Sequence, residues 1–135
     1  MKRRIAALIT VIAVMMAAVS CSGGLKSSLK GTWAIESISG VRIVPVNEVP
    51  CIRFTPKGTY QINTGLNLIS GDYVVEDGLL ELKPGIMTQK AGAPEAMAIE
   101  ESIVNAIQHK FEVSFNEGKA CLMGKDSNSF MILAP

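Results

Sequence analysis

Alternating apolar and polar positions predict β-structure along most of the chain after residue 30. The clearest segment is residues 31–38, where Trp33, Ile35 and Ser37 point to one side and their neighbours to the other. Similar alternation predicts further strands at 51–55, 59–63, 71–75, 79–83, 111–115, 120–123 and 129–133. We therefore expect a protein built mainly from short strands.

Turn residues separate these segments and predict hairpins. Pro56-Lys57-Gly58 lies between one pair of strands, and Glu76-Asp77-Gly78 lies between the next pair. Asp-Gly favours a tight hairpin because both residues accept positive φ angles. Residues 41–50 are apolar but contain two prolines, which cannot donate ladder hydrogen bonds. This segment is expected to form an edge strand and a loop.

One segment follows a helical period. Near residues 94–108, apolar side chains recur on one face of a 3.6-residue helix, and Pro94 suits the first helical position. Antiparallel hairpins with a single helix predict an α+β fold: a mostly antiparallel curved sheet or open barrel of about eight strands. The helix is inserted late and covers one face or mouth. The roughly 115 residues after the N-terminal segment are enough for one core without a cofactor.

The N-terminus carries an export signal. Three basic residues at positions 2–4 precede a mostly apolar run from Ile5 to Val19, and small residues follow. The run would rise about 22 Å as a helix, which is short for a retained transmembrane span. Ala18-Val19-Ser20-Cys21 resembles the bacterial lipobox, although its usual leucine is Ala18 here. The alternative is an ordinary secreted protein cut near Ser20.

The lipobox resemblance implies that Cys21 is acylated after residues 1–20 are removed. Residues 21–29 are then the acylated cysteine and a short tether, and residues 30–135 form the folded domain. Ser22-Gly23-Gly24 contains no acid that would suggest retention in the inner membrane. We therefore expect an outer-membrane lipoprotein of the cell envelope that faces the periplasm, with the membrane as its partner through the lipid anchor.

Charge and composition exclude several classes of protein. The chain is 48% apolar and 19% charged, which excludes disordered and collagen-like proteins. Three of the thirteen basic residues lie at positions 2–4, so residues 21–135 carry ten bases against twelve acids. This slightly acidic balance lacks the basic surface that nucleic-acid binding requires, so no nucleic-acid partner is expected.

The sequence contains no pattern typical of a catalytic or metal site. His109 is the single histidine, which is too few to begin a usual metal site. Nucleophile-elbow, Walker and dinucleotide-binding glycine patterns are absent. We therefore expect neither an enzyme nor a bound cofactor or metal, and the protein is expected to be a monomer.

Cys51 and Cys121 remain as thiols once Cys21 is acylated. Both lie in predicted strands, and an exported domain meets an oxidising compartment, so a structural disulfide between them is one interpretation. It requires Cα atoms within about 7 Å. The other interpretation is two reduced cysteines that pack as small apolar residues. The sequence leaves both open.

The order of several short motifs resembles the META domain family, which includes the HslJ-like heat-shock lipoproteins. The motifs, which span about residues 29–133, are Leu29-Lys30-Gly31-Thr32-Trp33, Ile52-Arg53-Phe54, Gly65-Leu66-Asn67, Gly71-Asp72-Tyr73, Thr88-Gln89-Lys90-Ala91-Gly92 and Glu100. The family's two motif cysteines correspond to Leu66 and Gly92, so a thiol function at those positions is not expected.

This resemblance implies an α+β fold, an envelope location, no established enzymatic activity and a link to stress tolerance. We expect a noncatalytic envelope lipoprotein that contacts another protein or the envelope. The main alternative is a lipocalin-like carrier of a small apolar ligand, suggested by Gly31-Thr32-Trp33, with a pocket between the helix and the sheet. Lipocalins place their main helix after all eight strands, whereas three predicted strands follow His109. A protease inhibitor with an exposed loop at 44–50 is a third, weaker interpretation.

Overall fold

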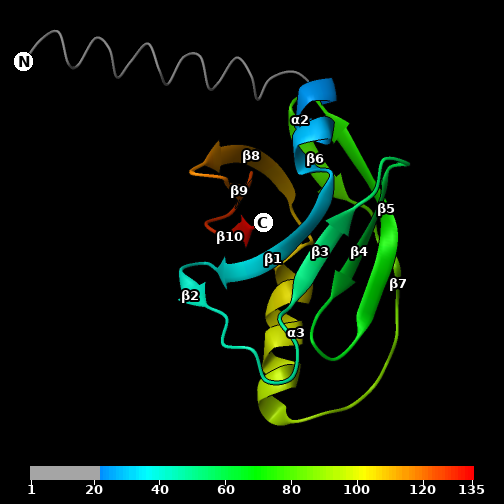
Figure 1. Cartoon of the computed structure of the whole chain (residues 1–135), viewed down its shortest axis with the longest axis vertical. Coiled ribbons are helices and arrows are strands. Elements are labelled where there is room, and N and C mark those ends of the chain that lie inside the picture. The colour runs from blue at the N-terminus through cyan, green and yellow to red at the C-terminus, as the bar shows by residue number, and fades with distance from the viewer. Residues whose placement is uncertain (1–21) are drawn as a thin grey trace, which may run out of the picture.

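Eight antiparallel strands close into a barrel because the first strand pairs with the last (Figure 1). The structure is a computed structural model that describes residues 22–135. Around the barrel, the order is β1 (Gly31–Ile38), β3 (Cys51–Phe54), β4 (Thr59–Asn63), β5 (Leu68–Glu76), β6 (Leu79–Leu82), β8 (Lys110–Asn116), β9 (Lys119–Gly124) and β10 (Phe130–Ala134). Two short strands are added outside this ring: β2 (Val41–Arg42) pairs with β1, and β7 (Ile86–Met87) pairs with β5.

The predicted α+β class and the eight main strands are confirmed, and the sheet is closed rather than open. One half of β1 pairs with β3, and its other half pairs with β10, where Ala34 lies opposite Ala134. The register of this second pairing shifts between Ile35 and Ser37. This β-bulge turns Ile38 into the core instead of Ser37, so the regular alternation expected along this strand was wrong at its end.

Large side chains fill the interior of the barrel. Phe54 and Phe111 are fully buried, and the Phe54 ring meets Tyr73 edge-on with their centroids 5.1 Å apart. The Trp33 ring lies 6.3 Å from Phe115, measured between centroids. These contacts are what a packed core requires, and they occupy the space that a lipocalin-type carrier reserves for its ligand.

The segment expected to be a flexible tether is instead a helix, α2 (Ser22–Leu29), packed on one end of the barrel. Leu25 and Leu29 are 1% and 0% exposed, and the Trp33 indole Nε1–H donates a hydrogen bond of 2.7 Å to the Leu29 carbonyl. Lys26 places its ammonium 5.5 Å from the centre of the Tyr73 ring. Burial of two leucines one helical turn apart outweighs the weak helix propensity of the serines and glycines.

The signal peptide expected at 1–20 and the acylated Cys21 lie outside the described residues. Within the part of the chain that the structure describes, no helix is long and apolar enough to cross a membrane.

The second helix, α3 (Pro94–Ala106), lies at the barrel end opposite α2 (Figure 1). Pro94 occupies its first turn as expected, and Ala96, Ile103 and Ala106 are the residues it buries. Strands β8, β9 and β10 all follow α3 in the chain. This order is the one that separates the expected family from lipocalins.

Of the two interpretations left open for Cys51 and Cys121, the structure agrees with the unpaired one and contains no disulfide between them. Both cysteines are free and half-buried. Cys51 lies in β3 and Cys121 in β9, and strands β1 and β10 stand between them in the barrel wall. Three strand spacings amount to about 14 Å along the wall, twice the Cα separation that a disulfide allows. The two cysteines are therefore not neighbours.

Candidate functional site

An apolar groove runs between α3 and the segment that follows β1. It has a volume of about 810 Å³. Its main apolar lining residues are Ile38, Val41, Ile43, Val44, Val46 and Ile99. The volume lies within the range of small-molecule binding sites, and the lining is of the kind that such sites use.

The outer wall of the groove exposes valines to solvent. Val41 and Val44 are 71% and 74% exposed, and Val46 is exposed as well. Val49, farther along the same segment, is also exposed but does not line the groove. Ile38, by contrast, is buried, and Ile43 and Ile99 pack against the core. Isolated exposed apolar residues are common, but a cluster beside a groove makes this surface the candidate binding site.

Contacts at both ends hold the valine-bearing segment in place. The Ile43 amide donates to the Glu36 carbonyl at 3.0 Å, and the Ile35 amide donates to the Pro50 carbonyl at 2.9 Å. Farther along, the Asn63 side-chain amide donates to the Glu48 carboxylate at 2.7 Å. The wall is therefore fixed before any ligand arrives, which lowers the entropy cost of binding.

The charged and titratable side chains around the groove are not paired with one another. Arg42, Glu95 and His109 line it, but no hydrogen bond or ion pair joins any two of them. Among residues 22–135, no three His, Cys, Asp or Glu side chains come together as a metal site would require. The predominantly apolar lining of the groove suits apolar groups.

A hydrogen-bonded cluster centred on Asn67 anchors α3 and the chain before it. Asn67 is 3% exposed, and its side-chain nitrogen donates to the Lys90 carbonyl at 3.1 Å and to the Glu100 carboxylate at 2.8 Å. Its oxygen accepts from the Thr88 hydroxyl at 2.9 Å and from the Lys90 amide at 2.7 Å. Thr64 donates to the same Glu100 oxygen at 3.0 Å. The turn after β4 thus fixes the helix that forms one side of the groove.

The two positions that lack the family's motif cysteines lie side by side next to this cluster. A Cβ atom at Gly92 would lie 2.7 Å from Leu66 Cδ1 and 3.7 Å from Leu66 Cγ. The leucine side chain therefore occupies the space that a side chain at position 92 would need. Leu66 and Gly92, one large and one small residue, together fill the volume that two cysteines would occupy at these positions.

A second hollow, of about 630 Å³, lies between α3 and the segment after β6. Tyr60 lines it and donates its hydroxyl to the Lys83 carbonyl at 2.7 Å. Burial, with a smaller contribution from Asp72, raises the pKa of Tyr60 above its ordinary value. A hydrogen bond from the Lys83 ammonium lowers the pKa of Glu81. The lining of this second hollow is more polar than that of the first groove, so we regard the first groove as the candidate site.

The site residues that the sequence predicted do not lie in the groove. Cys21 lies outside the described residues, and Cys51 and Cys121 do not line the groove. The expectation of a pocket between the helix and the sheet agrees with the position of the groove. The exposed valines were not predicted as a binding surface, although four valines between positions 41 and 49 in a proline-containing segment were a signal for one.

Several solved structures share this fold. The chain resembles an NMR structure of a protein from Burkholderia xenovorans, with a TM-score of 0.65 and 19% identity over 81% of this chain and 84% of that one. A second NMR structure matches with a TM-score of 0.60 and 18% identity over 77% and 88% of the two chains. A crystal structure of a DUF4847 family protein from Bacteroides vulgatus matches with a TM-score of 0.55 and 11% identity, over 78% and 92%. At these identities, the likeness concerns the fold alone.

No curated protein is similar enough in sequence to match the chain. The META domain model, however, matches residues 26–134. The match begins inside α2 and continues to the end of β10, so it includes the whole barrel, α3 and the hydrogen-bonded cluster centred on Asn67. This chain therefore belongs to the META domain family.

Proposed function

We propose that this protein is a noncatalytic, lipid-anchored envelope protein that acts by binding an apolar stretch of a partner protein in the groove beside α3. The observation that carries the proposal is the cluster of exposed valines on a fixed wall above a floor of isoleucines. Exposure of such an apolar surface to water is unfavourable in free energy, and a partner that covers the surface removes this cost. The anchor is Cys21, and the membrane is the outer membrane, on its periplasmic side.

A photoreactive amino acid at position 44 in the full-length protein tests this function in living cells. We expect a discrete protein adduct from position 44 and none from position 123, an exposed methionine outside the groove. The adduct should disappear when Val41→Asp is added, because a charge at the wall opposes apolar contact. An adduct of equal strength at position 123, or no adduct at 44, would contradict the proposal.

A second occupant is favoured by the volume of the groove, which suits a small apolar ligand. Because the barrel interior is filled, such a carrier would hold its ligand in the groove and not in the lumen. Native mass spectrometry of residues 22–135, which contain the entire core, distinguishes the two occupants. A co-purifying apolar molecule that is lost in the Val44→Asp variant would favour the carrier.

A role in stress tolerance, which the family resemblance implies, is part of the same proposal. It predicts that Val41→Asp impairs growth under stress as strongly as deletion of the gene does. Met123→Asp serves as the matched control, because it adds the same charge outside the groove.

A further inference from the structure

The position of α2 determines how far the barrel can move from its anchor. Leu25 is four residues after Cys21 and is buried in the barrel. Four residues span at most about 14 Å when fully extended, and about 6 Å as a helix. A domain of this size has a radius of gyration of about 13 Å, so the connection is shorter than the body that it holds. The end of the barrel that carries α2 therefore stays next to the acylated residue.

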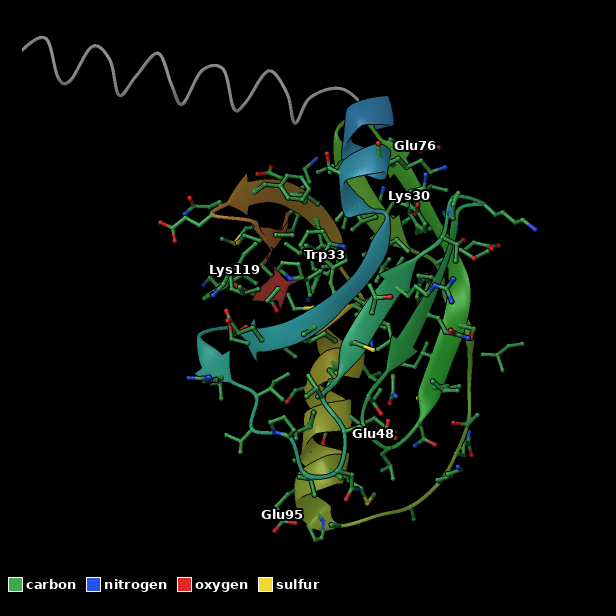
Figure 2. The ribbon with its side chains drawn as sticks, viewed as in Figure 1. Lys30, Trp33, Glu48, Glu76, Glu95 and Lys119 are labelled. Carbon is green, nitrogen blue, oxygen red and sulfur yellow. The ribbon has the colours of Figure 1, made fainter. Side chains whose placement is uncertain are left out.

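The two ends of the barrel differ in surface character. Val41, Val44, Val46 and Val49 are exposed near α3, and none of the exposed large apolar side chains belongs to α2 or to the turns beside it. Figure 2 shows Lys30 and Glu76 next to α2, whereas Glu48 and Glu95 lie toward the opposite end. The α2 end is thus polar, which suits lipid headgroups and does not suit insertion into hydrocarbon.

Charge at the α2 end is also compatible with a membrane surface. Lys26, Lys30 and Lys57 are exposed there, and the Lys26 ammonium approaches Gly58, the residue after Lys57. The acids near them are Glu76 and Asp77 in the neighbouring turn, and Asp72, which lies opposite Thr59 in the next strand. The three lysines and the three acids balance, so headgroup charge contributes little, and the orientation depends mainly on the short connection and little on salt.

We propose that the α2 end of the barrel lies against the lipid headgroups of the membrane that carries the anchor, so that the groove faces away from that membrane. This inference rests on the proposed acylation of Cys21. It adds that the occupant of the groove arrives from the aqueous side and is not a lipid of the same membrane. The helix α2, packed on the barrel, holds the domain close to the anchor, as a flexible tether would not.

Fluorescence quenching on vesicles tests the orientation. The mature acylated protein, with Cys51→Ser and Cys121→Ser, receives one fluorophore through either Lys57→Cys or Val44→Cys. It is added to vesicles of phosphatidylethanolamine and phosphatidylglycerol that carry a nitroxide quencher on the headgroup. We expect the fluorophore at position 57 to lose most of its emission and the one at position 44 to keep it.

A linker variant provides the matched control. Insertion of about fifteen glycine and serine residues between Cys21 and Ser22 gives a connection of about 22 Å on average and should remove the difference between the two positions. Mass measurement reports acylation separately, so an unacylated protein would refute the anchor alone. Equal quenching at positions 57 and 44 in an acylated, vesicle-bound protein would overturn the orientation and leave the anchor intact.

Discussion

Removal of the Asn67 side chain should be among the most damaging single changes in this protein. Asn67→Ala deletes four hydrogen bonds: three with neutral partners and one with the Glu100 carboxylate. Neutral bonds contribute about 1 kcal/mol each and a charged one about 2 kcal/mol, so the total is about 5 kcal/mol. Lys90 is exposed and Glu100 is half-exposed, so water replaces part of this loss. We expect a decrease of about 3 kcal/mol in the free energy of unfolding.

Urea unfolding of residues 22–135 measures this change, and hydrogen exchange locates it. Because Asn67 ties the turn after β4 to the chain before α3, exchange should accelerate first around Thr88 and Lys90. A loss of about 3 kcal/mol lowers the melting temperature of a domain of this size by about 12 °C. Asn128→Ala, in an exposed turn, is the control and should change little. A loss below about 1 kcal/mol for Asn67→Ala would refute the reasoning.

The Asn67→Asp variant tests the contact between Asn67 and Glu100 by placing a second carboxylate beside that of Glu100. It replaces the nitrogen that lies 2.8 Å from the Glu100 carboxylate with an oxygen, so two carboxylates face one another. The pair holds a proton more tightly in the folded state than in the unfolded state, and stability is therefore regained as the pH falls. The deficit relative to the wild type should shrink toward about pH 4, whereas that of Asn67→Ala should not. A constant deficit would contradict the assigned contact.

Three further predictions concern other parts of the fold. Burial raises the pKa values of Tyr60 and Tyr73, which are the only tyrosines. The stability that these groups contribute below about pH 10 should therefore be lost as the pH rises further. Absorbance at about 295 nm should show both side chains ionising at a higher pH than a free tyrosine does. Leu29→Ala should lower the free energy of unfolding by about 3 kcal/mol and release α2 from the barrel. Proteolysis near the N-terminus measures this release, and an α2 that stays protected would contradict the packing. The double variant Leu66→Cys/Gly92→Cys should form a disulfide that thiol counting detects, whereas free thiols would show that the two positions do not meet.

The strands were predictable because their local signals agree with the tertiary fold. Asp77 and Gly78 both have positive φ angles, as the Asp-Gly turn required, and Pro94 begins α3. The inserted helix was expected at 94–108 and occupies 94–106. In each of these segments, the turn or period that the sequence shows is also the one that burial rewards.

Features that depend on distant partners were not predictable. The helix α2 contains few good helix formers, and only the spacing of Leu25 and Leu29 hinted at it, because its stability comes from burial against the barrel. Whether Cys51 and Cys121 pair depends on the strand order, which no local pattern contains, so the sequence left that question open. The groove likewise depends on how α3 meets the segment after β1, so its valines resembled an ordinary loop in the sequence.

The contact between β1 and β10 has a consequence for biosynthesis. Ala34 and Ala134 pair across nearly the whole chain, so the first strand cannot complete its pairing until the last strand is available. Until residues 130–134 arrive, β1 and β9 each keep an open edge that other strands can join. Long-range closure of this kind also slows folding. Loss of the last few residues would therefore expose the folding chain to aggregation and proteolysis, and it would lower the amount of protein instead of weakening its binding.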